Sequence, residues 1–128
     1  MKDTQDDEPA IGAVPKQVLD SFAGEVDAAA LLLKAMGHPG RLMILCHLVG
    51  SEKSVTDLED MLGARQASVS QQLSRLRFEG LVKPRRVGKS MHYSLADARL
   101  APLLSILLRQ FCGEANLDTA MTASAEAL

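Results

Sequence analysis

Apolar residues recur every three or four positions along much of the chain, and this spacing is typical of amphipathic helices. It predicts five helices, over residues 16–36, 39–49, 54–62, 67–79 and 98–113. Between the last two helices the period changes to two, which predicts strands over 81–86 and 90–95. The turn at 87–89 joins them into a β-hairpin, and Pro84 favours an edge strand.

Local signals support the helix boundaries. Pro39 suits the first turn of its helix, and glycines follow the second, third and fourth helices. Ser54 is expected to be an N-cap, with the Asp57 carboxylate in the first turn, and Asp97 is expected to cap the last helix. The first helix carries an apolar stripe of Phe22, Val26, Ala29, Leu33 and Met36, and the last carries a broad apolar face of Leu100, Leu103, Leu104, Leu107, Leu108 and Phe111.

The composition indicates one soluble domain of mainly α structure with flanking tails. The chain has 128 residues, 47% of them hydrophobic, without Trp and with only two Cys, so a disulfide scaffold is excluded. No apolar run is long enough to cross a membrane, and the first residues lack the features of a signal peptide, so we expect a cytoplasmic protein with reduced thiols. We expect a disordered acidic tail at 1–16, a folded domain at 17–113 and a frayed tail at 114–128.

Charge is distributed unevenly, although the net charge is only −2. Residues 1–30 hold seven acidic and two basic residues, whereas residues 65–92 hold seven basic residues and one acidic residue. A local basic block is what contact with phosphates requires. Charge clustering on a solvated surface has the same appearance, so charge alone does not decide the function.

The order of elements adds a stronger signal. A short helix, a tight turn at Gly63 and a second helix match a helix-turn-helix, and the basic hairpin that follows matches a wing. Gln, Ser and Arg side chains on the second helix suit contact with base edges and phosphates. The predicted DNA-binding residues are Gln66, Ser68, Ser70, Gln71, Gln72 and Arg75 on this helix, and Arg85, Arg86 and Lys89 on the hairpin.

Three segments resemble the ArsR family of winged-helix repressors. Residues 32–45 contain His-Pro-Gly-Arg-Leu-Met-Ile-Leu, which is similar to the family's opening motif; residues 68–82 resemble its recognition helix; and residues 89–95 resemble its second wing strand. The resemblance covers about residues 25–113. It implies a homodimer, with the first and last long helices at the interface, that represses by binding an inverted repeat. Gln72 stands where many members have His.

The resemblance also directs attention to the inducer, because family members differ mainly in what they sense. The short helix lacks the Cys-x-Cys of arsenic and cadmium sensors, which excludes soft-metal sensing at that place. Asp97 is retained from the pattern of zinc sensors, but Arg99, Leu108 and Phe111 occupy positions that would need ligands. His38, His47 and His92 are scattered and are interpreted as structural or solvent-facing. We therefore expect no metal and no other cofactor.

Cys46 and Cys112 remain as candidate sensing groups. Taken alone, two cysteines in a cytoplasmic protein are often small buried apolar residues. Their contexts, Leu45-Cys-His-Leu48 and Phe111-Cys-Gly113, resemble the dithiol of the SqrR/BigR persulfide-sensing subgroup, with HlyU-type regulators as close relatives. The resemblance implies that persulfides or polysulfides bridge the two thiols, that the dimer then releases DNA, and that the target genes serve sulfide and sulfur metabolism.

Other interpretations remain open. The same dithiol would serve a general peroxide or thiol-redox switch, or a HlyU-like regulator. A small thiol enzyme is disfavoured because the chain has no Cys-x-x-Cys and no catalytic His–carboxylate constellation. A protein–protein adaptor with a winged-helix fold would not need the basic block at 65–92.

Overall fold

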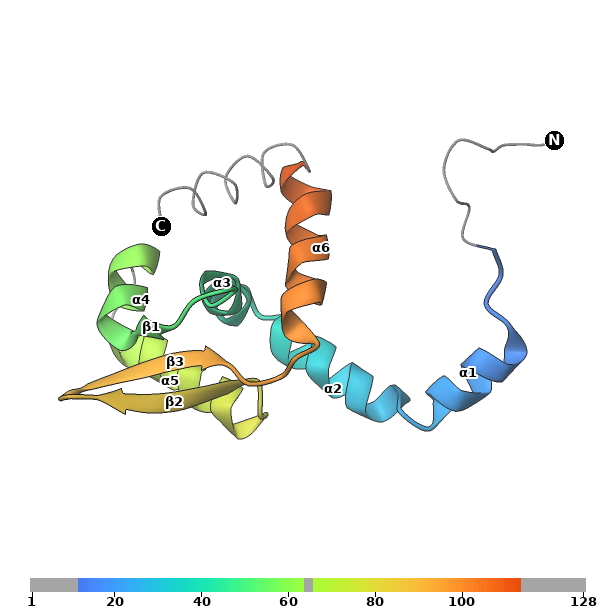
Figure 1. The fold of residues 1–128 in the computed structure, drawn as a ribbon, viewed down its shortest axis with the longest axis horizontal. Helices are drawn as coiled ribbons and strands as arrows, with labels where there is room; N and C mark the ends of the chain where they lie inside the picture. The colour runs from blue at the N-terminus through green and yellow to red at the C-terminus, as the bar shows by residue number, and fades with distance from the viewer. Residues whose placement is uncertain (1–11, 64–65, 114–128) are drawn as a thin grey trace. The chain divides into compact units, whose positions relative to one another are not determined.

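The computed structural model describes residues 12–63 and 66–113, and in these residues the chain forms six helices and three strands (Figure 1). In chain order they are α1 (Lys16–Ala23), α2 (Val26–Met36), α3 (Pro39–His47), β1 (Lys53–Ser54), α4 (Val55–Leu62), α5 (Gln66–Phe78), β2 (Val82–Val87), β3 (Ser90–Leu95) and α6 (Leu100–Cys112). The chain divides into two compact units, one ending at Leu33 and the other beginning at Lys34. The tails predicted at 1–16 and 114–128 lie outside the described residues, apart from 12–16.

The strands form one antiparallel sheet in the order β1-β3-β2. Pro84 lies opposite Tyr93 in an edge strand, which confirms the prediction made from the proline. The hairpin turns at Gly88, whose φ of 61° is readily adopted only by glycine. The strand β1 was not predicted, because two residues are too few to show a period.

The helix-turn-helix consists of α4 and α5. The Ser54 hydroxyl accepts a hydrogen bond from the Asp57 backbone N–H at 3.0 Å, and the Asp57 carboxylate accepts one from the Ser54 N–H at 3.0 Å. This reciprocal capping box confirms the predicted N-cap. The helix α4 ends at Gly63, which is left-handed with a φ of 61°, and α5 begins at Gln66.

Buried hydrophobic side chains from α3, α4, α5 and α6, from the end of α2 and from β2 form the core of the second unit. The largest fully buried side chains belong to Ile44, Leu45, Leu48, Leu58, Val69, Leu73, Leu76, Leu100 and Leu104. None of the buried side chains in the described part of the chain is polar or charged. The core therefore depends on hydrophobic burial, with little contribution from internal polar bonds.

Two of the predicted helices differ in extent from those observed. The helix predicted over 16–36 is divided into α1 and α2, because Gly24 ends the first of them. Its expected stripe does not form a buried face: Phe22 is 47% exposed and Leu33 is 61% exposed. The helix predicted to reach residue 49 ends at His47, where Leu48 is the C-cap.

The last helix begins later than predicted. It starts at Leu100 instead of residue 98, and its N-cap is Arg99, which makes no side-chain capping bond. Asp97 accepts a hydrogen bond from the Arg99 backbone N–H at 2.9 Å, so it closes the turn before the helix and is not the helix cap.

We predict that Leu58→Ala lowers the free energy of unfolding by about 2–5 kcal/mol, because it leaves a cavity where a side chain is 0% exposed. Met61→Ala on the same helix is the matched control, since Met61 is 50% exposed, and its cost should stay below about 1 kcal/mol. Urea unfolding at one fixed protein concentration measures both values. Equal costs would contradict the assignment of Leu58 to the core.

Candidate nucleic-acid interface and thiol pair

The helix α5 has one buried and one exposed face. Val69, Leu73 and Leu76 are each no more than 2% exposed and hold the helix in the core. The opposite side is polar and exposed, and it includes four residues predicted to contact DNA: Ser68, Ser70, Gln71 and Arg75. Gln66, the fifth residue of α5 that was predicted to contact DNA, is the first residue of the helix. The fold thus presents a polar helical face to solvent.

Exposed residues of α5 that were not predicted to contact DNA include Ser74, Arg77 and Phe78. Ser74 is exposed, and the Phe78 side chain is 87% exposed. They follow Gln71 at spacings of three and seven, so helical periodicity was the signal that should have included them. The sequence analysis selected side chains that can hydrogen-bond to base edges, which explains the omission of Phe78 but not that of Ser74.

Gln72 lies between helices and not on this exposed face. Its side chain is half-buried, and its Oε1 accepts a hydrogen bond from Arg41 Nη1 at 3.3 Å. Arg41 also donates through Nε to the Ala35 carbonyl oxygen at 2.7 Å. The Arg41 side chain therefore connects the end of α2 with α5. Gln72 was predicted to face DNA, but it adjoins the buried stripe of the helix, where a long side chain turns inward.

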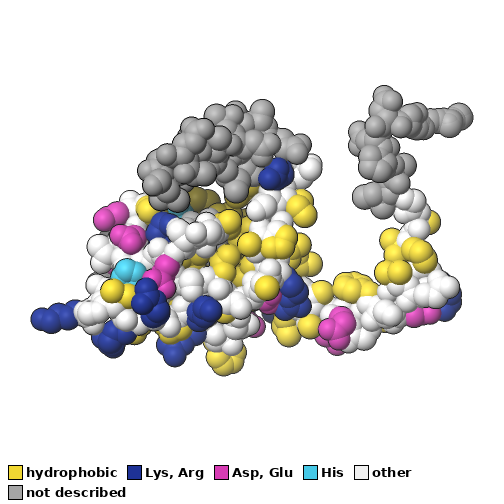
Figure 2. Space-filling view, in the orientation of Figure 1, with side chains coloured by type: hydrophobic (Ala, Val, Ile, Leu, Met, Phe, Trp, Pro, Cys, Tyr) yellow, Lys and Arg dark blue, Asp and Glu magenta, His cyan; other side chains and the backbone are white. Residues whose placement is uncertain are grey.

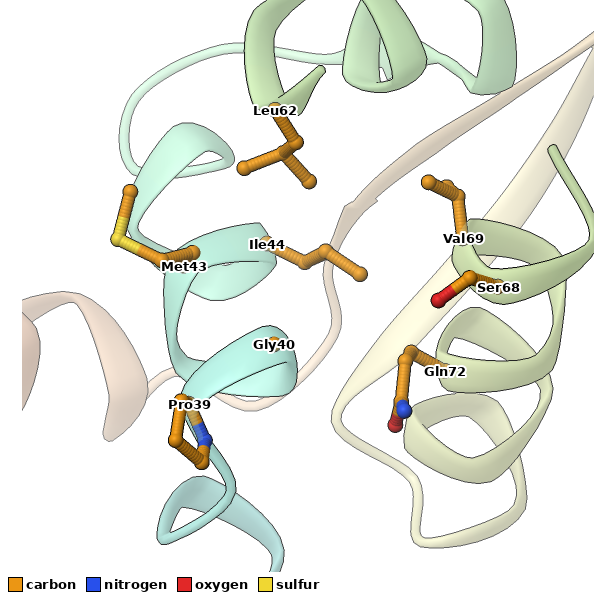
Figure 3. Close-up of a pocket in the computed structure, with 8 residues that line it drawn as sticks. All are labelled: Pro39, Gly40, Met43, Ile44, Leu62, Ser68, Val69 and Gln72. Atoms are coloured by element: carbon orange, nitrogen blue, oxygen red, sulfur yellow. The ribbon is translucent and has the colours of Figure 1, made fainter. Parts of the chain in front are cut away.

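A cavity of about 280 Å³ lies beside Gln72, between α3, the end of α4 and the first half of α5. Figure 3 shows Ile44 extending across it towards α5, with Ser68 and Gln72 facing it from the other side. Its remaining lining residues are Pro39, Gly40, Met43, Leu62 and Val69. The cavity is mostly apolar.

The wing carries basic residues on β2 and at its turn. Arg85, Arg86 and Lys89 are all exposed, and Figure 2 shows Lys and Arg side chains gathered over the hairpin and α5. Lys89 also lines a hollow of about 230 Å³, together with residues 54–56 at the start of α4. The exposed cations provide the positive surface that DNA phosphates require.

Carboxylates engage two of the predicted DNA-binding arginines. Arg85 donates to Glu52 through Nε at 3.0 Å and through Nη2 at 2.6 Å. This hydrogen-bonded pair lowers the pKa of Glu52 and raises the pKa of Arg85. Arg75 donates through Nε to Glu79 at 3.1 Å. Part of the basic surface is therefore neutralised within the protein.

The two cysteines come from α3 and the last turn of α6. Cys46 is half-buried, Cys112 is exposed, and both are thiols. Burial raises the pKa of the Cys46 thiol, and the charge of Cys112 raises it further. The second cause is mutual: a negative charge on one thiolate disfavours ionisation of the other.

The described residues contain no cluster of three or more His, Cys, Asp or Glu side chains that suits a metal ion. Asp97 receives two hydrogen bonds from the Arg99 guanidinium, at 2.9 and 2.6 Å, so its carboxylate already has a cationic partner. His38 caps α3, where its Nδ1 accepts from the Gly40 N–H at 3.0 Å. His92 lies on β3 near Glu52.

In the part of the chain described, no helix is long and apolar enough to cross a membrane.

A short capped helix, a glycine turn, a helix with an exposed polar face and a basic hairpin define a winged helix-turn-helix protein. Residues 38–83 match the model of the arsR family of bacterial regulatory proteins. The chain is 44% identical over 108 residues to the biofilm growth-associated repressor of Agrobacterium fabrum. The aligned region covers 84% of this chain and 90% of the relative. The chain therefore belongs to the arsR family, whose members are DNA-binding transcriptional regulators and not enzymes.

Solved structures agree with this assignment. The transcriptional repressor BigR from Xylella fastidiosa is similar with a TM-score of 0.68 and 41% identity, over 77% of this chain and 98% of that one. Reduced HlyU from Vibrio cholerae N16961 is similar with a TM-score of 0.66 and 34% identity, over 75% of this chain and 98% of that one. These similarities confirm the predicted winged-helix fold.

We predict that Asp97→Asn lowers the free energy of unfolding by about 1–2 kcal/mol near pH 7. The Arg99 guanidinium holds the pKa of Asp97 at about 2, below its ordinary value of 3.8. The ionised carboxylate therefore stabilises the fold above about pH 4, and this contribution is lost as the pH falls through about 2. The difference between the variant and the parent should shrink over that range.

Thermal or urea unfolding at several pH values measures this difference. Asp60→Asn, which removes a carboxylate from an exposed position on α4, is the control. A penalty for Asp97→Asn that is independent of pH would show that the ion pair does not cause it.

Proposed function

We propose that this chain is a cytoplasmic homodimeric repressor that binds an inverted-repeat operator in double-stranded DNA. We further propose that reactive sulfur, as a persulfide or polysulfide, bridges Cys46 and Cys112 and causes release of the DNA. The genes it controls then serve sulfide and sulfur metabolism. The observation that carries the sensing proposal is the presence of two free thiols on α3 and α6, one half-buried and one exposed, and the effect of Cys112 on the pKa of Cys46 is consistent with it.

Exposed apolar side chains support the dimer. Val18, Leu19 and Leu31 on the first two helices are each more than half exposed, and on α6 Ile106 is 56% and Phe111 85% exposed. Hydrophobic side chains along α6 are visible in Figure 2. Apolar surface of this extent favours a protein–protein interface. We assign the dimer contacts to these helices, within a DNA-binding and dimerisation domain spanning 17–113.

The contacts to DNA follow from exposure and chemistry. We assign base contacts to Gln66, at the start of α5, and to the exposed polar residues Ser68, Ser70 and Gln71. Phosphate contacts are assigned to four basic residues: Arg75, Arg85, Arg86 and Lys89. Gln72 is assigned a positioning role, because its side chain bonds to Arg41. In a dimer, two copies of α5 would enter successive major grooves about 34–36 Å apart.

The accessibility of the thiols suggests the order of the chemical steps. The exposed Cys112 thiolate attacks the outer sulfur of a persulfide R–S–SH, which transfers that sulfur to Cys112 and releases the thiolate R–S⁻. The Cys46 thiolate then attacks the inner sulfur of the Cys112 persulfide and expels HS⁻, which leaves a disulfide. The sulfane sulfur is reduced to sulfide and the two thiols are oxidised, so no other oxidant is needed. Because the pKa of Cys46 is raised, its thiol must lose a proton before it attacks in the second step.

The bridge would act on DNA through the position of α6. A covalent link between α3 and α6 restricts their separation, and α6 belongs to the proposed dimer interface. A change there alters the spacing of the two recognition helices. Coupling free energies of about 1–3 kcal/mol are typical, which corresponds to a loss of DNA affinity of roughly 5- to 150-fold.

The relatives support repression. The Agrobacterium fabrum relative is a biofilm growth-associated repressor, and the Xylella fastidiosa structure is that of a transcriptional repressor. The similar HlyU structure from Vibrio cholerae is that of the reduced protein.

We predict that the reduced protein selects an inverted repeat from a pool of random duplexes and binds it with a steep dependence on salt. If four to eight phosphates are neutralised, a plot of log affinity against log salt concentration should have a slope of about −4 to −7. Fluorescence anisotropy measures the slope. A selected site without two-fold symmetry would contradict the dimer, and a slope near zero would contradict phosphate contact by the basic block.

We predict that Cys46→Ser and Cys112→Ser each bind this duplex as tightly as the parent, within about twofold, and fail to release it with glutathione persulfide. Each variant retains only one thiol, so the bridge cannot form. In the parent, the intact mass under non-reducing conditions should show loss of two hydrogens, or that loss plus added sulfur, with release of DNA. Variants that still release DNA would refute the dithiol. The same response of the parent to peroxide and to oxidised glutathione would identify a general thiol-redox switch instead.

A further inference from the structure

Glu52, just before β1, holds the guanidinium of Arg85 on β2. Two parallel hydrogen bonds join them, at 3.0 Å from Nε to Oε2 and at 2.6 Å from Nη2 to Oε1. This is the bidentate fork that an arginine forms with a carboxylate or with a phosphate. The residues are 33 positions apart in the sequence, so the sheet must bring them together.

The register of the sheet explains how this happens. The central strand β3 places His92 opposite Arg85 on one side and opposite Ser54 on the other. The short strand β1 thereby anchors the segment that carries Glu52 at the base of the wing. His92 Nδ1 lies 3.7 Å from the Glu52 carboxylate, beyond hydrogen-bond distance, so Arg85 is the principal partner.

The two partners differ in exposure. The Glu52 side chain is 28% exposed, whereas the Arg85 side chain is 65% exposed. The carboxylate is therefore the anchored partner, and the arginine is the end that can move into solvent or towards a ligand. The pair also lowers the pKa of Glu52, so the carboxylate remains charged at neutral pH.

We propose that Glu52 is an internal competitor for DNA phosphate, which holds Arg85 in the unbound protein and so lowers the affinity of the wing for DNA. The bonds to Glu52 occupy the Nε and Nη2 edge of the Arg85 guanidinium, so a phosphate that binds this edge must displace the carboxylate. While the pair is intact, the negative charge of Glu52 also weakens the attraction of Arg85 for any phosphate. The inference rests on the proposed function, because it assumes that the wing meets the DNA backbone. Glu52 is thereby assigned as a residue that sets DNA affinity without touching DNA.

The test is a double-mutant cycle of Glu52→Gln and Arg85→Ala, with binding to a mixed-sequence duplex of about 30 base pairs, long enough for two half-sites. Phosphate contacts do not depend on sequence, so this probe reports on them directly. Glu52→Gln keeps the shape of the side chain and removes its charge. It should tighten binding by about threefold to tenfold in the parent, and by less than about twofold when Arg85 is already Ala.

Asp60→Asn is the matched control for charge, because it removes one negative charge from an exposed position on α4. An equal gain in affinity from Asp60→Asn, or the same gain from Glu52→Gln with and without Arg85, would show a general charge effect and overturn the proposal. No gain from Glu52→Gln would also overturn it.

A second measurement examines the pair without DNA. In NMR spectra of the unbound protein, the Arg85 Nε–H should exchange slowly with water and become fast in Glu52→Gln. Fast exchange in the parent would overturn the inference even if the protein binds DNA. Failure of the parent to bind the duplex at low salt would instead refute the proposed function, and the inference with it, so the two failures are distinguishable.

Discussion

Burial of aliphatic side chains from α3, α4, α5 and α6 in one core is the constraint on which the rest of the structure depends. Among the described residues, the core contains no large aromatic ring and no polar side chain, so shape and hydrophobic burial are the main determinants of helix packing. The hydrogen bonds from Arg41 to Ala35 and Gln72 add to them. Because Val69, Leu73 and Leu76 must be buried, the polar face of α5 must point outward. The same core holds α6 by Leu100 and Leu104 near its start, which leaves Cys112 at its other end exposed. One packing arrangement thus determines both the outward direction of the polar face of α5 and the accessibility of a thiol.

Basic side chains on the surface of the protein are partly neutralised by acidic ones. The net charge is −2, yet the wing and α5 present a basic surface. Acidic side chains lie within that surface, and two of them pair with arginines. A DNA-binding protein gains from such pairing when its function requires release, since excess positive charge would favour binding to any duplex. When the affinity for DNA is moderate, an inducer whose coupling free energy is a few kcal/mol is enough to release the DNA.

Much of this architecture could be predicted from the sequence, for identifiable reasons. Helical periodicity, the Ser54 cap and the glycines gave the helix-turn-helix, and the change to a period of two gave the hairpin. The break at Gly24 was missed because apolar spacing continues through it from Phe22 to Val26. The strand β1 and the ion pair between Glu52 and Arg85 were missed because both depend on a pairing register between distant segments. The inward position of Gln72 was missed because its partner, Arg41, lies on another helix. The proposed pairing of the two cysteines has no local signal in the sequence, and it was expected from the family resemblance.

The scarcity of aromatic residues has a practical consequence. The chain contains no Trp and a single Tyr, Tyr93. That residue lies in the central strand of the wing, opposite Lys53 on one side and Pro84 on the other. The tyrosine fluorescence of the unlabelled protein therefore originates at one defined point, and its intensity and anisotropy report the local environment of the wing without any introduced probe.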